Sequence, residues 1–193
     1  MTILIIFLKI LHIVTAILMA WPFYALVAVN QRGRLGPPLG DRVDILLENT
    51  IKNRTLPCFI FQATVMVSGL ALVLLRGLGL GALLSNPALG LKFLLLLFIS
   101  GLLVYVHLRL QPAIDRLFAA NSPISKEIAG QIQILRLRRK RLSSICMFSV
   151  LTMAMLGVQV YTPLPLWFTL VLLGLIAAFT WRAYSSQMSY GWL

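Results

Sequence analysis

Five long apolar runs constrain this chain more than any other feature. They cover residues 3–29, 57–76, 90–109, 144–161 and 164–182. A helix needs about 20 apolar residues to cross a hydrocarbon core about 30 Å thick, and each run is near that length. The prolines of the sequence TPLP (162–165) break the last apolar stretch into two helices. We therefore expect an all-α, polytopic bundle of five transmembrane helices.

The composition agrees with a membrane protein. Hydrophobic residues make up 60% of the 193 residues, whereas soluble domains contain about 45–50%. No segment is polar enough for a separate soluble domain, so we expect residues 1–193 to form a single transmembrane bundle. The first run exceeds the roughly 7–15 apolar residues of a signal peptide, and we expect a retained helix there.

Positive charges alternate between the connections of the predicted spans. Most Lys and Arg residues lie in the loops 30–56 and 110–143, whereas the other two connections are nearly free of them. Because cytoplasmic loops carry such an excess, we expect the N-terminus outside and the C-terminus in the cytoplasm. The net charge of +12 then indicates contact with anionic headgroups, because motifs for nucleic-acid binding are absent. The predicted location is a bacterial-type plasma (inner) membrane.

Both basic loops contain predicted helices. Residues 40–54 form an amphipathic helix expected at the membrane interface. One of its faces is apolar (Val43, Leu46, Leu47) and another is charged (Asp44, Glu48, Lys52). In the second loop, Ser122 and Pro123 form a helix start signal and Ser125 is also a candidate cap, and a helix is expected to continue from about Lys126 into the fourth span. Its basic end is expected to contact lipid headgroups or a partner through Arg136, Arg138, Arg139, Lys140 and Arg141.

The two cysteines are not expected to form a structural disulfide. Cys58 and Cys146 each begin an apolar run after a basic loop, which places them near the reducing side of the membrane. With no histidine nearby, they do not match the ligand spacing of a zinc site.

Few ionisable residues remain inside the spans. All five acidic residues lie in the predicted inner loops, which argues against a carboxylate-driven transporter. An ionisable side chain within a span is by default a functional-site hypothesis. Lys9 and His12 lie three residues apart in the first span. Lys9 can extend toward the outer surface, but His12 lies roughly 15 Å deep and needs a partner.

Depth favours Lys92 over His107 as that partner. His107 is expected roughly 25 Å below the outer surface, about 10 Å deeper than His12, whereas Lys92 begins the third span. His12 and Lys92 are therefore the predicted cofactor-binding residues, with His12 as a haem-iron ligand and His107 as the second choice. This requires an uncharged Lys92 amine. Two alternatives stay open: a histidine bonded to a Ser, Thr or carbonyl of a neighbouring span, and a proton relay.

The first and third spans carry short motifs of a known group. Lys9, His12 and Trp21 form a K-x-x-H pattern followed by an aromatic residue, and the span 91–117 has a Lys near its start. The chain resembles small bacterial membrane proteins that include HemJ-type protoporphyrinogen oxidases, CopD-type copper-resistance proteins and a family of uncharacterised predicted integral membrane proteins. The resemblance to HemJ-type proteins implies that His12 and Lys92 hold a b-type haem. The sequence AWPF and the fifth span depart from HemJ and favour the uncharacterised branch.

We therefore expect a small membrane protein that binds haem b or is associated with a membrane electron-transfer complex. The alternative is a non-catalytic accessory subunit whose apolar faces pack against other membrane subunits or a second copy. A small transporter or copper-handling protein is the third reading. By itself the chain is not expected to be an enzyme, and any activity would be that of a haem-dependent membrane oxidoreductase.

Overall fold

The chain folds into a bundle of long helices. Its computed structural model describes residues 2–29, 39–52, 55–120 and 124–185. Within those ranges every regular element is helical and none is a strand. Five helical stretches are long and apolar enough to cross a membrane. The all-α class and the five candidate spans predicted from the apolar runs are therefore confirmed.

The helices follow the order of the apolar runs. They are α1 (Thr2–Val29), α3 (Arg42–Lys52), α4 (Thr55–Leu75), α5 (Ala82–Ser85), α6 (Pro87–Tyr105), η1 (Val106–Leu110), α7 (Gln111–Ala120), α8 (Lys126–Gln159) and α9 (Leu166–Ser185). The five apolar runs lie in α1, α4, α6 with η1, α8 and α9. Residues 30–38 and 53–54 of the first basic loop, and 121–123 of the second, lie outside the described residues.

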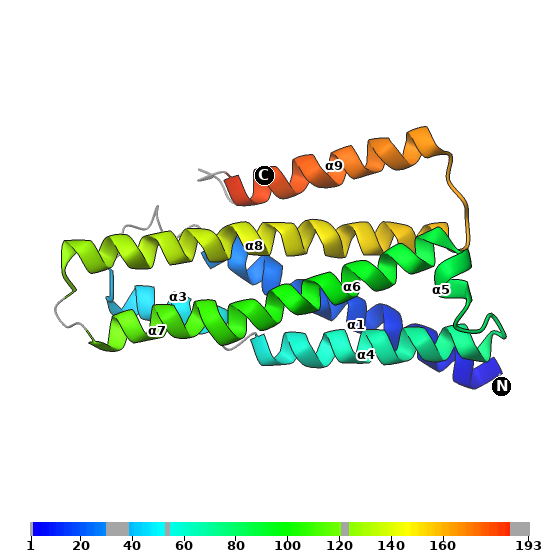
Figure 1. The fold of residues 1–193 in the computed structure, drawn as a ribbon, viewed down its shortest axis with the longest axis horizontal. Helices are drawn as coiled ribbons and strands as arrows, with labels where there is room; N and C mark the ends of the chain where they lie inside the picture. Colours follow the sequence, from blue (N-terminus) through cyan, green and yellow to red (C-terminus); the bar gives the residue numbers. More distant parts are fainter. Residues whose placement is uncertain (1, 30–38, 53–54, 121–123, 186–193) are drawn as a thin grey trace.

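The two ends of the bundle contain different helices (Figure 1). At the α5 end, α1 and α6 begin, and α4 and α8 finish. At the α3 end, α7 and the first half of α8 extend beyond the start of α4 and lie with α3 (Figure 1). This extension carries the described parts of the basic loops, so most of the charged residues that the structure describes lie at the α3 end.

Helix boundaries follow the local capping chemistry. The Asn86 side chain accepts a hydrogen bond from the backbone N–H of Leu89 at 3.2 Å, and Pro87 is the first residue of α6. The Ser125 hydroxyl accepts from the N–H of Ile128 at 3.4 Å, which confirms the predicted start of α8. The break between α8 and α9 falls at the predicted prolines.

A π-helical turn, η1, joins α6 to α7. The backbone N–H of Gln111 donates to the carbonyl of Val106, five residues earlier. Pro112 follows directly and has no N–H, and its ring crowds the preceding turn of an α-helix. The wider turn accommodates that ring. Gln111 is buried at the end of this segment, whereas His107 within it is exposed.

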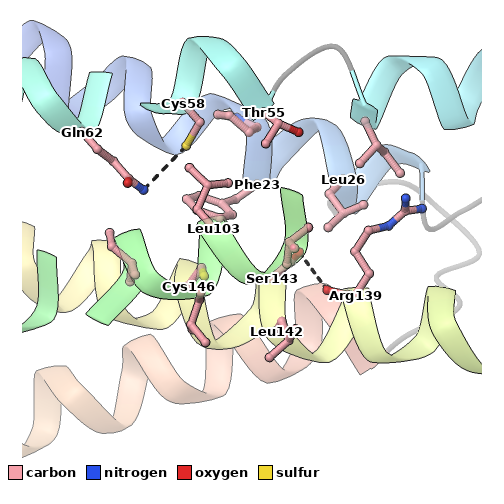
Figure 2. Close-up of a pocket in the computed structure, with 15 residues that line it drawn as sticks. Phe23, Leu26, Thr55, Cys58, Gln62, Leu103, Arg139, Leu142, Ser143 and Cys146 are labelled. Atoms are coloured by element: carbon pink, nitrogen blue, oxygen red, sulfur yellow. Dashed lines mark hydrogen bonds between the residues drawn. The ribbon is translucent and has the colours of Figure 1, made fainter. Parts of the chain in front are cut away.

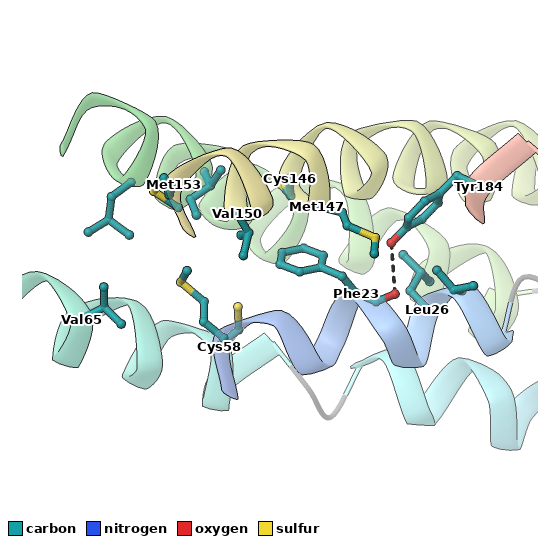
Figure 3. Close-up of a cluster of buried hydrophobic side chains, with 13 residues drawn as sticks. Phe23, Leu26, Cys58, Val65, Cys146, Met147, Val150, Met153 and Tyr184 are labelled. Atoms are coloured by element: carbon teal, nitrogen blue, oxygen red, sulfur yellow. Dashed lines mark hydrogen bonds between the residues drawn. The ribbon is translucent and has the colours of Figure 1, made fainter. Parts of the chain in front are cut away.

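The spanning helices pack mainly as two pairs, α1 with α4 and α6 with α8. α9 packs against α8, on the side away from α4 (Figure 1). The Tyr184 hydroxyl on α9 donates to the carbonyl of Phe23 on α1 at 3.1 Å. The apolar core lies between the pairs (Figure 3) and contains Met19, Phe23, Leu26, Val27, Cys58, Val65, Leu96, Ile99, Cys146, Met147, Val150, Met153 and Tyr184.

Both cysteines are buried in this core as free thiols.

Candidate functional site

His12 contacts α4 through its ring. The side chain is half-buried, and its Nδ1 lies 3.0 Å from the hydroxyl oxygen of Ser68. The Ser68 hydroxyl donates its only hydrogen to the carbonyl of Thr64 at 2.6 Å. Nδ1 must therefore carry the ring hydrogen and donate to Ser68. This tautomer leaves the lone pair of Nε2 free to accept a donor or to bind a metal.

Two glycines make room for the nitrogen-bearing side chains. A Cβ atom added to Gly69 would lie 3.1 Å from Cε1 of His12, so the imidazole lies directly against α4. A Cβ atom added to Gly157 would lie 3.1 Å from Nζ of Lys92, so the amine lies against α8. Each nitrogen is thus held against the neighbouring helix of its own pair.

His12 and Lys92 lie in the same half of the bundle. Lys92 is five residues from the start of α6, or about 8 Å along the axis, and Ser68 is seven residues from the end of α4, or about 10 Å. The structure therefore brings both predicted residues to the α5 end, and their sharing of one cofactor stays a prediction.

His107 lies at a different level. It is exposed, and its ring contacts the edge of Phe59 on α4, with 5.7 Å between centroids. Phe59 precedes Ser68 by nine residues, or about 13 Å along the helix. The two histidines are therefore separated along the bundle axis in the direction that the depth argument predicts.

A second polar region, the ion cluster, lies at the α3 end. It joins α3 (Asp44, Glu48), α7 (Gln111, Asp115) and α8 (Arg136, Arg139). Arg139 is only 2% exposed. It donates to both carboxylate oxygens of Glu48, with Nη2 to Oε2 at 3.0 Å, and to Oε1 of Gln111 at 2.6 Å. Arg136 donates to the two oxygens of Asp44 at 3.0 and 2.9 Å.

These contacts correct the expectation for the basic end of α8. Arg136 and Arg139 bind carboxylates of the chain itself, and their burial removes them from the headgroup contacts predicted for them. Lys140 is half-buried, whereas Arg138 and Arg141 are exposed. Among the five cations, these last two are the exposed ones, and the guanidinium of Arg138 lies over the ring of Tyr105, 5.8 Å from its centroid.

The reason lies in the orientation of α3. The predicted amphipathic helix is present, but its acidic face is the buried one, with Asp44 and Glu48 at 3% and 7% exposure. Its apolar face is turned outward, with Val43 and Leu46 exposed. The sequence contained a signal for this packing, because the two acids are four residues apart and the two arginines three apart. Each pair therefore shares a helix face, and the two faces are complementary in charge.

Glu48 is the most strongly perturbed acid of the ion cluster. Burial raises its pKa, but the hydrogen bond and charge of Arg139, the charge of Arg136 and the hydrogen bond from Gln111 together lower it to about 2. Its carboxylate is therefore ionised at neutral pH. Because each charge meets an opposite charge, the ion cluster has the arrangement of a structural tie between three helices.

The two polar regions differ in what their side chains could bind. The described residues contain no group of three or more His, Cys, Asp or Glu side chains that could hold a metal ion. A metal at the α5 end would depend on the nitrogen atoms of His12 and Lys92.

No family model matches the chain, and neither a curated protein nor a solved structure matches it. The resemblance carried by Lys9, His12 and Trp21 therefore stays a prediction.

Proposed function

We propose that this protein binds haem b in the membrane and takes part in electron transfer, with His12 and Lys92 as iron ligands. One observation carries the proposal. The Nδ1 hydrogen of His12 is directed to Ser68, which leaves Nε2 free. Histidine ligands of metals are held in this way by a hydrogen bond from their second nitrogen. A bound haem would supply one-electron transfer.

The nitrogen donors fit haem iron, because neutral imidazole and amine nitrogens both bind it. They also belong to opposite helix pairs, His12 to the α1–α4 pair and Lys92 to the α6–α8 pair. The seam between the pairs is where such a group would have to lie. The cavity of about 70 Å³ in this seam is lined by residues nearer the α3 end, so a porphyrin requires the pairs to separate at the α5 end.

Five residues of the chain would then prepare the site. His12 offers its Nε2 lone pair, and Ser68 fixes the ring tautomer and its orientation. Gly69 permits the close approach of the ring to α4, and Gly157 gives the Lys92 amine a position against α8. Lys92 must be uncharged to bind iron.

The charge distribution supports an orientation for the proposed protein. The N-terminus and the α5 end would face outward, and the ion cluster at the α3 end would face the cytoplasm of a bacterial-type cell. Arg138 and Arg141, both exposed, would meet anionic headgroups there. Single cysteines introduced in place of Leu84 at the α5 end and Arg141 at the α3 end test this orientation. A membrane-impermeant thiol reagent applied to whole cells should label only the first.

The haem proposal is tested by the spectrum of protein purified from haem-replete cells. A reduced-minus-oxidised difference spectrum should show Soret and alpha bands. His12→Ala should abolish them, and Lys92→Met should weaken or shift them. His107→Ala is the matched control, because it removes the other histidine from an exposed position and should leave the bands unchanged. A colourless preparation, or bands that persist in His12→Ala, would refute the proposal.

A second candidate is a non-catalytic accessory subunit of a larger membrane complex. It is favoured by hydrogen bonds that tie the spans to one another without any cofactor. The bond from His12 to Ser68 joins α1 to α4, and Gln159 donates to Thr169 at 2.7 Å across the α8–α9 turn. For this function, partner subunits should copurify in fixed ratio. His12→Ala should weaken the packing of α1 against α4, and both the natural chain and the variant should be colourless.

A further inference from the structure

A small cavity lies in the seam between the two helix pairs, away from His12 and Lys92. Its volume is about 70 Å³ and it is partly open. Figure 2 shows Cys58 and Gln62 projecting from α4, with Leu103 of α6 and Cys146 of α8 on the other side. Most of its lining is apolar. Gln62 precedes Ser68 by six residues, so the cavity is displaced by about 9 Å along α4 from the His12 contact.

Gln62 gives this cavity an unsatisfied polar group. The residue is 5% exposed, and its Nε2 donates to Sγ of Cys58 at 3.8 Å. Its carbonyl oxygen, Oε1, is buried and accepts no hydrogen bond from the described residues. A buried acceptor without a donor costs about 1–3 kcal/mol. The cavity therefore presents a position that a hydrogen-bond donor would stabilise.

The other hydroxyl groups of the lining have already used their hydrogens. Thr55 donates to the carbonyl of Lys52 at 3.1 Å, and Ser143 donates to the carbonyl of Arg139 at 2.9 Å. The terminal nitrogens of Arg139 are directed to Glu48 and Gln111. The two hydroxyls keep acceptor lone pairs but have no hydrogen left to donate, and the terminal nitrogens of Arg139 already donate elsewhere. A ligand that fits this lining must donate, as a hydroxyl does, rather than accept, as a ketone or an ester does.

The apolar part of the lining favours an aromatic ring. Phe23 of α1 lines the cavity with two sulfur atoms from opposite pairs, those of Cys58 and Cys146 (Figure 2). Aromatic rings pack favourably against other rings and against sulfur. A flat ring also suits a seam between two helix pairs better than a branched group does. Because the cavity is small and partly open, only the head of a ligand would lie inside it.

We propose that this cavity binds the head of a membrane-soluble phenol, with the phenolic O–H donating to Oε1 of Gln62. The ring lies between Phe23 and Leu103, and the rest of the molecule extends from the cavity. The site is independent of haem, because it uses none of the residues proposed as iron ligands.

The test compares two probes that share the methylated ring and its oxygen, and the second carries a methyl group in place of the phenolic hydrogen. Purified protein in detergent is titrated with 4-methylphenol and with 4-methylanisole, its methyl ether, and the rise in unfolding temperature is followed. 4-Methylphenol should bind saturably and about tenfold more tightly than the ether, as expected for one hydrogen bond to a buried acceptor. Equal binding of the two probes, or a rise that does not saturate, would overturn the proposal.

Variants locate the effect. Gln62→Leu should abolish the preference for the phenol, and it should fold because it removes an unsatisfied polar atom. Gln159→Leu is the matched control, because its side chain bonds Thr169 outside the cavity, and it should keep the preference. Leu103→Trp should fill the cavity and prevent binding of both probes. A preference that survives in Gln62→Leu, or binding that survives in Leu103→Trp, would show that the phenol binds elsewhere and refute the assignment.

Discussion

The ion cluster at the α3 end and the His12–Lys92 region at the α5 end arrange their polar groups differently. In the ion cluster, Arg139 and Arg136 meet the carboxylates of Glu48 and Asp44. At the α5 end, His12 uses one nitrogen for Ser68, and no acidic residue occurs in any of the apolar runs.

This difference separates a structural role from a binding role. Charged side chains that pair with one another hold the helices together and leave few donors or acceptors for a ligand. A nitrogen that keeps its lone pair can accept a ligand, and a half-buried amine in a span is expensive unless a partner meets it. Changes in the ion cluster should therefore affect stability most, whereas changes around His12 should affect ligand binding more than stability.

Removing one charge from the ion cluster should have the largest effect on stability. Glu48→Gln leaves the buried Arg139 without its main counter-charge, and the free energy of unfolding in detergent should fall by about 3–5 kcal/mol. The double variant Glu48→Gln, Arg139→Gln removes both charges and should recover much of that loss. Glu127→Gln, at an exposed carboxylate, should change stability by about 0.5 kcal/mol or less. If Glu127→Gln lowers the free energy of unfolding as much as Glu48→Gln does, the ion cluster does not stabilise the packing of the three helices.

Acid should weaken the same region. The pKa of Glu48 is about 2 in the folded protein and near 4.5 when unperturbed. Because the folded pKa is the lower one, the stabilisation is complete above about pH 4.5 and is lost as the pH falls from 4.5 toward 2. The difference corresponds to about 3 kcal/mol. Unfolding measured at pH 6 and pH 3 should show about 2 kcal/mol of this loss in the natural chain, because pH 3 still lies above the folded pKa, and a smaller loss in Glu48→Gln. An equal loss in both would contradict the assignment.

The spans and helix boundaries could be predicted because their signals are local. A run of about 20 apolar residues is sufficient to indicate a spanning helix. Ser125 capping and the prolines of 162–165 act on the residues beside them. The common level of His12 and Lys92 could also be predicted, because depth in a bundle of antiparallel helices follows from counting residues at 1.5 Å each.

The ion cluster and the cavity could not be read from local patterns. The partners Asp44 and Arg136 are 92 residues apart, and their contact depends on how α3 rotates about its axis. The amphipathic pattern of residues 40–54 indicated two faces, but hydropathy alone assigned the helix to the membrane interface and did not indicate that its acidic face is the buried one. Gln62 is an ordinary polar residue within an apolar run, and its importance depends on the lone pair that the packing leaves unused.

Glycine substitutions test whether the His12 contact depends on close packing. Gly69→Ala places a Cβ atom 3.1 Å from Cε1 of His12, so the ring must move and its bond to Ser68 must lengthen. The expected loss of stability is about 1–2 kcal/mol, with weaker haem binding. Gly174→Ala in α9 is the matched control, because nothing lies within 4 Å of the added atom, and alanine should leave stability unchanged or raise it. Equal behaviour of the two variants would show that the ring is not held against α4.

Ser68→Ala should have the smallest effect on stability. Hydrogen bonds between membrane helices contribute about 0.6 kcal/mol on average, so unfolding in detergent should change little. Haem affinity should nevertheless fall by about 10–100-fold, because the ring loses the partner that fixes its tautomer. Ser100→Ala is the control, since Ser100 bonds the carbonyl of Leu96 in its own helix, and it should affect neither quantity. If Ser68→Ala lowers stability without changing the haem spectrum, the contact serves only to join α1 to α4, and the accessory function is the better explanation of His12.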